Sequence, residues 1–112
     1  MPTKSKVYTN LLSDTDRIKV RQVTSGHNVI DFSVQYEALI ESRWRKIARY
    51  DSAHGQPHRH VYHPNEMEYI HTMNEQDNNQ ALTEAQTVIK RNFRVLKERY
   101  IIALGNAEGD EI

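Results

Sequence analysis

The chain of 112 residues contains no cysteine. Disulfide bonds, thiolate zinc sites and cysteine nucleophiles are therefore excluded, and the absence fits a reducing compartment, so we expect a cytoplasmic protein. No apolar run approaches the roughly 20 residues of a membrane-spanning helix, so we expect no membrane partner. The stretch Met1–Asn10 also lacks the apolar segment that a secretory signal requires.

An excess of one charge is missing too. Fifteen basic and fifteen acidic residues give a net charge of zero, which removes the bulk electrostatic attraction that draws a protein to nucleic acid. The basic residues nevertheless gather around a group of histidines, at Arg43, Arg45, Lys46, Arg49 and Arg59. A local basic face on a neutral protein is therefore still possible. The length predicts a single domain over residues 1–112.

Alternation of apolar and polar residues predicts an antiparallel sheet. In the stretch Val29–Ile40, every even-numbered residue from Ile30 onward takes one face and polar residues take the other, which is typical of a strand with one buried face. The stretch Arg17–Val23 alternates in the same way, and a turn is expected over residues 24–28.

Two further strands are predicted after Ile40. Residues 44–51 would place Trp44, Ala48 and Tyr50 on one side and Ile47 on the other. Residues 58–63 would follow after a loop that contains a glycine and a proline. Short connections between such strands predict a meander of three or four strands.

The last third of the chain predicts one long amphipathic helix. Apolar residues recur every three or four positions, at Leu82, Ala85, Ile89, Phe93, Leu96 and Tyr100. Gly105 is a natural helix-ending residue, so residues 106–112 are expected to form a frayed acidic tail, and residues 1–16 a loosely ordered lead-in. The fold class is then α+β, with the helix packed across the apolar face of the sheet.

The end of this helix carries more apolar residues than a single stripe needs. Tyr100, Ile101 and Ile102 are consecutive, so they cannot all face the same side of a helix. They predict either a wider buried face within the chain or a homodimer contact through the C-terminal helix. Both interpretations stay open.

Five of the six histidines fall between positions 54 and 71. Because side chains alternate along a strand, His58 and His60 share one face, and Tyr62 continues that face. The opposite face receives Arg59, Val61 and His63. His58 and His60 are therefore the pair most suited to act together.

The histidine pair is compatible with a metal site or with a docking surface. Two imidazoles placed two residues apart on a strand can reach one ion, with His54 as a third ligand and Asp51 as a fourth ligand or an orienting group. Alternatively, the face binds a partner protein, since arginine, histidine and tyrosine are good contact residues.

A third hypothesis is acid–base chemistry on RNA, which needs neither metal nor cofactor. Cleavage by a 2′-hydroxyl requires a base, an acid and a cation for the phosphate. His58 and His60 would divide the roles of base and acid, and Arg49 or Arg59 would hold the phosphate. The remaining candidates are Tyr62 for the chemical step, and Tyr50, Asp51 and His54 for contact with the substrate.

The sequence ARYDSAHG at residues 48–55, followed by PHRH at residues 57–60, resembles a pattern of small prokaryotic proteins. In that pattern a strand ending in Arg-Tyr-Asp leads through a short loop to a histidine-rich strand, and a C-terminal helix follows. It looks like the TumE-type toxins of toxin–antitoxin modules, over residues 29–63. The residues that match its motif are Arg49, Tyr50, Asp51, His58 and His60.

The resemblance implies interference with RNA or translation, and an antitoxin protein as partner. The prediction is therefore a toxin-like protein that cleaves or binds RNA through a face of histidine, arginine and tyrosine side chains. The alternative is a non-catalytic protein whose histidine-rich strand binds a partner protein or a divalent metal.

Overall fold

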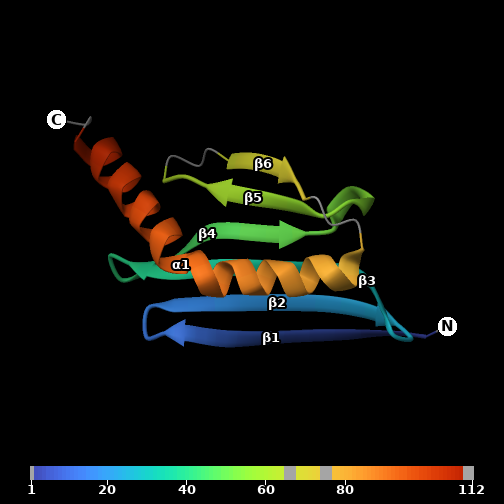
Figure 1. Ribbon diagram of the computed structural model, residues 1–112. Coiled ribbons are helices and arrows are strands. Elements are labelled where there is room, and N and C mark those ends of the chain that lie inside the picture. The colour runs from blue at the N-terminus through green and yellow to red at the C-terminus, as the bar shows by residue number, and fades with distance from the viewer. Residues whose placement is uncertain (1, 65–67, 74–76, 110–112) are drawn as a thin grey trace.

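The computed structural model describes residues 2–64, 68–73 and 77–109, which form one antiparallel sheet and one helix (Figure 1). The six strands follow one another across the sheet in chain order, as in a meander. Their bounds are β1 Thr3–Ser13, β2 Asp16–Ser25, β3 Asn28–Ile40, β4 Arg43–Asp51, β5 His58–Tyr62 and β6 Glu68–Thr72. A 3₁₀ turn, Ala53–Gly55, lies between β4 and β5, and helix α1 spans Asn78–Gly109.

The α+β class is confirmed, but the sheet has six strands, and the expected three or four were too few. Residues that the sequence assigned to a loosely ordered lead-in form β1, which pairs with β2 along almost its whole length. The side chains of β1 are mostly exposed on both faces, so it is held by backbone hydrogen bonds to β2 and little by burial. Its alternation is correspondingly weak, which is why the pattern missed it.

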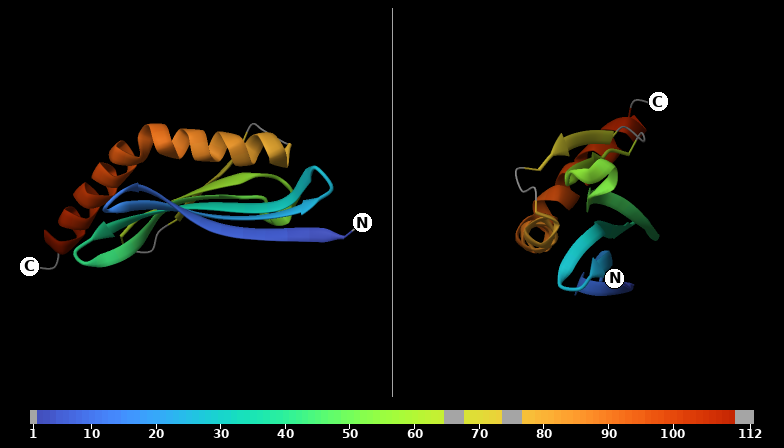
Figure 2. Two further views of the ribbon diagram at one scale, coloured as in Figure 1. Left: turned by 90° about the horizontal axis from the view of Figure 1, so that it is seen from below. Right: turned by 90° about the vertical axis from the view of Figure 1, so that its right-hand side faces the viewer.

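Helix α1 packs on one face of the sheet, and no other described element covers the opposite face (Figure 2). We call these the helix face and the open face. The core lies between α1 and strands β2, β3 and β4, and it contains Ile18, Val20, Phe32, Val34, Tyr36, Ile47, Ala85, Ile89 and Phe93. The predicted apolar stripe of the helix therefore packs in or against the core, and so does the predicted face of β3 from Phe32 onward.

A bulge in β4 changes which of its side chains face the core. Tyr36 pairs with Ala48 and Glu37 pairs with Lys46, so Ile47 is an extra residue without a partner on β3. As a result Ile47 and Ala48 are both buried, although they are neighbours in the chain. The side chains before the bulge therefore alternate in the opposite phase to those after it. Trp44 points to the face opposite Ala48, so the prediction that the two residues share a face was wrong.

A second bulge corrects the expected face of β3 at its start. Val23 pairs with Asp31 and Thr24 pairs with Val29, so Ile30 is the unpaired residue. Ile30 is exposed, and Val29 packs against the core in its place. Period-two alternation assigned Ile30 to the buried face because it assumed a strand without a bulge.

Helix α1 begins at Asn78 because Asp77 caps it. The Asp77 carboxylate accepts the backbone N–H of Asn79 at 2.7 Å, and the Asp77 carbonyl accepts that of Ala81. The helix continues past Gly105 to Gly109, so the predicted end was wrong: Gly105 keeps helical backbone angles. Residues 106–109 of the expected frayed tail are thus helical, and residues 110–112 lie outside the described part of the chain.

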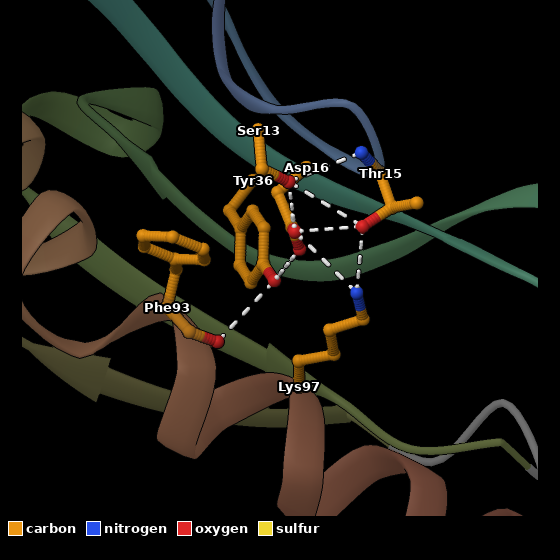
Figure 3. A network of polar contacts seen from close by, with 6 residues as sticks. All are labelled: Ser13, Thr15, Asp16, Tyr36, Phe93 and Lys97. Atoms are coloured by element: carbon orange, nitrogen blue, oxygen red, sulfur yellow. Dashed lines mark hydrogen bonds and ion pairs between the residues drawn. The ribbon is translucent and has the colours of Figure 1, made fainter.

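Near its middle α1 bends, and its second half turns away from the first along the end of the sheet (Figures 1 and 2). A buried polar network lies on the sheet side of this region (Figure 3). The Tyr36 hydroxyl is 2.6 Å from Asp16 Oδ1 and 3.2 Å from the carbonyl oxygen of Phe93 in the helix. Ser13, Thr15 and Lys97 also donate to Asp16, so residues from the β1–β2 turn, β3 and α1 meet at one carboxylate.

Candidate functional site

The pairing of β4 with β5 places both histidines of interest on the open face. His58 lies opposite Asp51 and His60 lies opposite Arg49. Residues paired across antiparallel strands point to the same face, so these four side chains form one cluster. We call this cluster, Arg49, Asp51, His58 and His60, the histidine face. It includes the two imidazoles that strand alternation assigned to one side of the sheet.

One carboxylate connects the cationic members of the histidine face. Asp51 Oδ2 lies 2.8 Å from Nε of Arg49 and 3.2 Å from Nε2 of His60. Asp51 Oδ1 accepts the backbone N–H of Ala53 at 3.3 Å, which ties the carboxylate to the turn after β4. The side chains of Asp51 and His60 are only 9% and 11% exposed, so the contact is shielded from water. A single carboxylate thus lies against both a guanidinium and an imidazole.

Tyr62 continues the open face at the end of β5, two residues beyond His60. The ammonium group of Lys46, from β4, lies 4.9 Å from the centre of its ring. An aromatic ring and a cation therefore stand beside the histidine face, in the direction of the β3–β4 turn.

Two of the predicted substrate contacts are not part of this cluster. Tyr50 and Arg59 pair with each other across β4 and β5, and both point to the helix face. Tyr50 is buried, which raises the pKa of its phenol; Arg59 opposes this effect but does not cancel it. With His71 and Glu84 they line a cavity of about 320 Å³ beneath the first half of α1. The structure therefore separates Tyr50 and Arg59 from His58 and His60.

The backbone of His54 lies in the 3₁₀ turn after β4, but its side chain is outside the described part of the structure. Its predicted roles as a substrate contact or a metal ligand stay predictions. Among the described residues, no group of three or more histidine, aspartate or glutamate side chains is placed to hold a metal ion. The metal hypothesis, which includes His54 as a ligand, stays a prediction.

A second hollow of the surface was missed by sequence reasoning. A cavity of about 540 Å³ lies at the β3–β4 end of the sheet, beside the second half of α1. We call it the basic notch. It is lined by Arg43, Trp44, Arg45, Lys46, Tyr62, His63, Pro64 and Tyr100. The run of basic residues near position 45 was visible in the sequence, but its meeting with His63 and Tyr100 depends on the fold.

The family known as DUF7718, a domain of unknown function, matches residues 1–105. The chain belongs to this family. The match spans every strand and most of the helix, so the family is defined over the whole fold described above. Comparisons with curated proteins and with solved structures give no match. The resemblance to TumE-type toxins is not supported by these comparisons and stays a prediction.

In the described part of the chain, helix α1 contains no stretch that is both long and apolar enough to cross a membrane.

Proposed function

We propose that the histidine face cleaves RNA without a cofactor, by attack of a ribose 2′-hydroxyl on the adjacent phosphate. One observation carries this proposal: the Asp51 carboxylate contacts both the guanidinium of Arg49 and the imidazole of His60. An imidazole and a guanidinium beside one carboxylate supply two of the three groups that this reaction requires, a base and a cation for the phosphate. His58, in register with Asp51, adds the second imidazole.

The roles follow from the environment of each histidine. His60, which the Asp51 carboxylate contacts at 3.2 Å, takes the proton from the 2′-hydroxyl as the O2′–P bond forms. His58 enters protonated and gives its proton to the 5′-oxygen as the P–O5′ bond breaks. The products are a 2′,3′-cyclic phosphate and a 5′-hydroxyl, and one proton has moved from the substrate to His60 and one from His58 to the product.

The spacing of the two histidines suits this division. Two residues along a strand separate backbone positions by about 7 Å, so two imidazoles can stand on either side of one phosphate. Arg49 gives one of its five N–H donors to Asp51, and its side chain remains 34% exposed. Its other donors can therefore bind the non-bridging oxygens, where charge increases during the reaction.

In a cell this activity would make the protein toxic, as the resemblance to TumE-type toxins implies. Its partner would be an antitoxin protein that covers the histidine face. This part of the proposal rests on the Arg-Tyr-Asp and His-Arg-His motifs at residues 49–51 and 58–60. Expression of the wild-type chain should then arrest growth, and replacement of His60 by alanine should relieve the arrest.

The test of the proposed chemistry uses purified protein and an end-labelled RNA, with a chelator present throughout. The wild type should release fragments with 2′,3′-cyclic phosphate ends, and His58→Ala and His60→Ala should each slow release at least a hundredfold. His27→Ala is the matched control, because His27 is exposed in the β2–β3 turn. Intact RNA with the wild type, or equal rates in all four proteins, would overturn the proposal.

A second candidate function is the docking of a partner protein on the open face without catalysis. The observation that favours it is Ile70 of β6, which pairs with His60 across the strands and is 58% exposed. An exposed aliphatic side chain beside the histidine face is suited to a protein contact. If this candidate is correct, Ile70→Asp should abolish partner binding while the RNA assay shows no cleavage by any variant.

A further inference from the structure

We propose that the basic notch binds one nucleotide of a single-stranded RNA, with its phosphate at Arg43 and Lys46 and its base against Trp44. The inference rests on the proposed function for the identity of the polymer, and it adds a binding site that the chemistry at the histidine face does not itself require. The notch would hold the strand that continues from the cleaved phosphate.

The notch exists because β5 is much shorter than β4. The pairing of the two strands ends at Ala48 and Val61, so the first half of β4 extends beyond its described partner. Residues 62–64 and Tyr100 of α1 form the other walls. The hollow therefore lies where the pairing between β4 and β5 ends. A bound ligand can lie there beside β4 without disturbing the core.

Positive charge predominates in the notch, although the whole protein is neutral. Within residues 2–64, 68–73 and 77–109, its lining includes Arg43, Arg45, Lys46 and His63 and no acidic residue. Arg45 is paired with Glu41 at 3.2 Å, in an exposed contact. Among the described residues, no carboxylate lies within ion-pair distance of Arg43 or Lys46. Two cations that line one hollow can bind the same phosphate.

Aromatic rings in the same hollow supply a surface for a base. Trp44 is 37% exposed, and the guanidinium of Arg17 lies 3.8 Å from the centre of its ring. Tyr62 and Tyr100 also line the notch. Cations interleaved with aromatic rings are typical of sites for single-stranded nucleic acid, in which phosphates meet the charges and bases stack on the rings. A double helix keeps its bases stacked inside and could not use these rings.

Part of the notch shares the open face with the histidine face. The bulge at Ile47 turns Trp44 and Lys46 to the face that also carries Arg49. Tyr62, which lines the notch, follows His60 by two residues on β5. An extended RNA strand that lies along β4 and β5 therefore passes from the histidine face into the notch.

The chain contains a single tryptophan, so Trp44 reports directly on the notch. We expect a single-stranded RNA ten-mer to quench Trp44 fluorescence on binding at low salt, because a base stacks on the indole. Inorganic tripolyphosphate should compete with the RNA without causing the same quenching. Double-stranded RNA of equal length should bind more weakly and leave the emission nearly unchanged.

The charge contribution is tested with the double variant Arg43→Ala, Lys46→Ala. Binding should weaken at least tenfold, and the slope of log affinity against log salt should fall by about 0.7 for each phosphate that the variant no longer neutralises. The matched control is Lys90→Ala, Arg91→Ala, which removes the same two charges from exposed positions on α1. Equal losses of affinity in the two double variants, or RNA binding without quenching of Trp44 fluorescence, would contradict the proposed binding site in the notch.

The outcomes separate this inference from the proposed reaction. If the wild type binds RNA with quenching of Trp44 fluorescence but cleaves no RNA, the result supports the binding site in the notch and contradicts the proposed chemistry of the histidine face. If the Arg43→Ala, Lys46→Ala variant cleaves RNA and binds it with unchanged affinity, the result supports the proposed chemistry and contradicts the binding site in the notch. His60→Ala should bind and quench as the wild type does while it loses cleavage.

Discussion

The hydroxyl of Tyr36 lies 2.6 Å from Oδ1 of Asp16, beneath the middle of α1 (Figure 3). Both residues are buried, and Tyr36 also meets the carbonyl oxygen of Phe93 in the helix. The contact therefore joins β2, β3 and α1 at one point. Burial and the neighbouring Asp16 carboxylate raise the pKa of Tyr36 far above its ordinary value, so it stays a hydrogen-bond donor at neutral pH.

Replacing Tyr36 with phenylalanine should lower the free energy of unfolding by about 2 kcal/mol, because Asp16 then keeps a buried negative charge with one donor fewer. Urea denaturation at pH 7 measures this loss. Tyr8→Phe is the control, since Tyr8 is only partly buried on β1 and should change stability by under about 0.5 kcal/mol. Equal stability of Tyr36→Phe and the wild type would show that the network contributes little.

Acid should destabilise the fold through Asp16. Burial alone would raise the pKa of this carboxyl, but hydrogen bonds from Ser13, Tyr36 and Thr15 and the charge of Lys97 hold it below its ordinary value of 3.8. The unfolded chain therefore binds the proton more readily than the folded chain. The stabilisation is fully present above the unfolded pKa and is lost as the pH falls through the folded pKa.

Unfolding free energies measured between pH 7 and pH 2.5 test this dependence. We expect Asp16→Asn to be less stable than the wild type at pH 7, and its stability to fall less steeply below pH 4. An acid limb that is as steep in Asp16→Asn as in the wild type would show that other carboxyl groups account for the effect.

The β3–β4 turn stores backbone strain at two residues. Glu41 and Ser42 have φ angles of 55° and 65°, in the left-handed region that favours glycine. Ser42→Gly should therefore stabilise the protein by about 1 kcal/mol, since glycine occupies this region without strain. Ser33→Gly, in the middle of β3, should instead destabilise it by about 0.5–1 kcal/mol. Thermal melting of the two variants gives the signs, and a lower melting temperature for Ser42→Gly would contradict the prediction.

The proposed chemistry depends on Asp51 through His60. Asp51→Asn keeps the shape of the side chain but removes the negative charge that contacts both Arg49 and His60, so RNA cleavage should fall about a hundredfold or more. Circular dichroism should show an intact fold. Asp14→Asn, in the exposed β1–β2 turn, removes one carboxylate away from the histidine face and should cleave RNA at the wild-type rate. An unchanged rate for Asp51→Asn would remove Asp51 from the mechanism.

Local patterns in the sequence predicted those elements whose burial is regular. The stripe from Leu82 to Tyr100 predicted one long helix, and alternation from Val29 to Ile40 predicted the central strand. The edge strands β1 and β6 were not predicted because their described side chains are largely exposed, and exposed strands need no apolar alternation. The helix end was misplaced because Gly105 can adopt helical angles as well as left-handed ones.

The sequence by itself determined that His58 and His60 share a face, because the two-residue period of a strand is a local property of the backbone. Only the tertiary structure decided their neighbours. Pairing between β4 and β5 brings Asp51 to His60 and turns Arg59 and Tyr50 away, while the bulge at Ile47 moves Trp44 to the open face. Register and bulges depend on hydrogen bonds between strands, so no pattern within a single strand contains them.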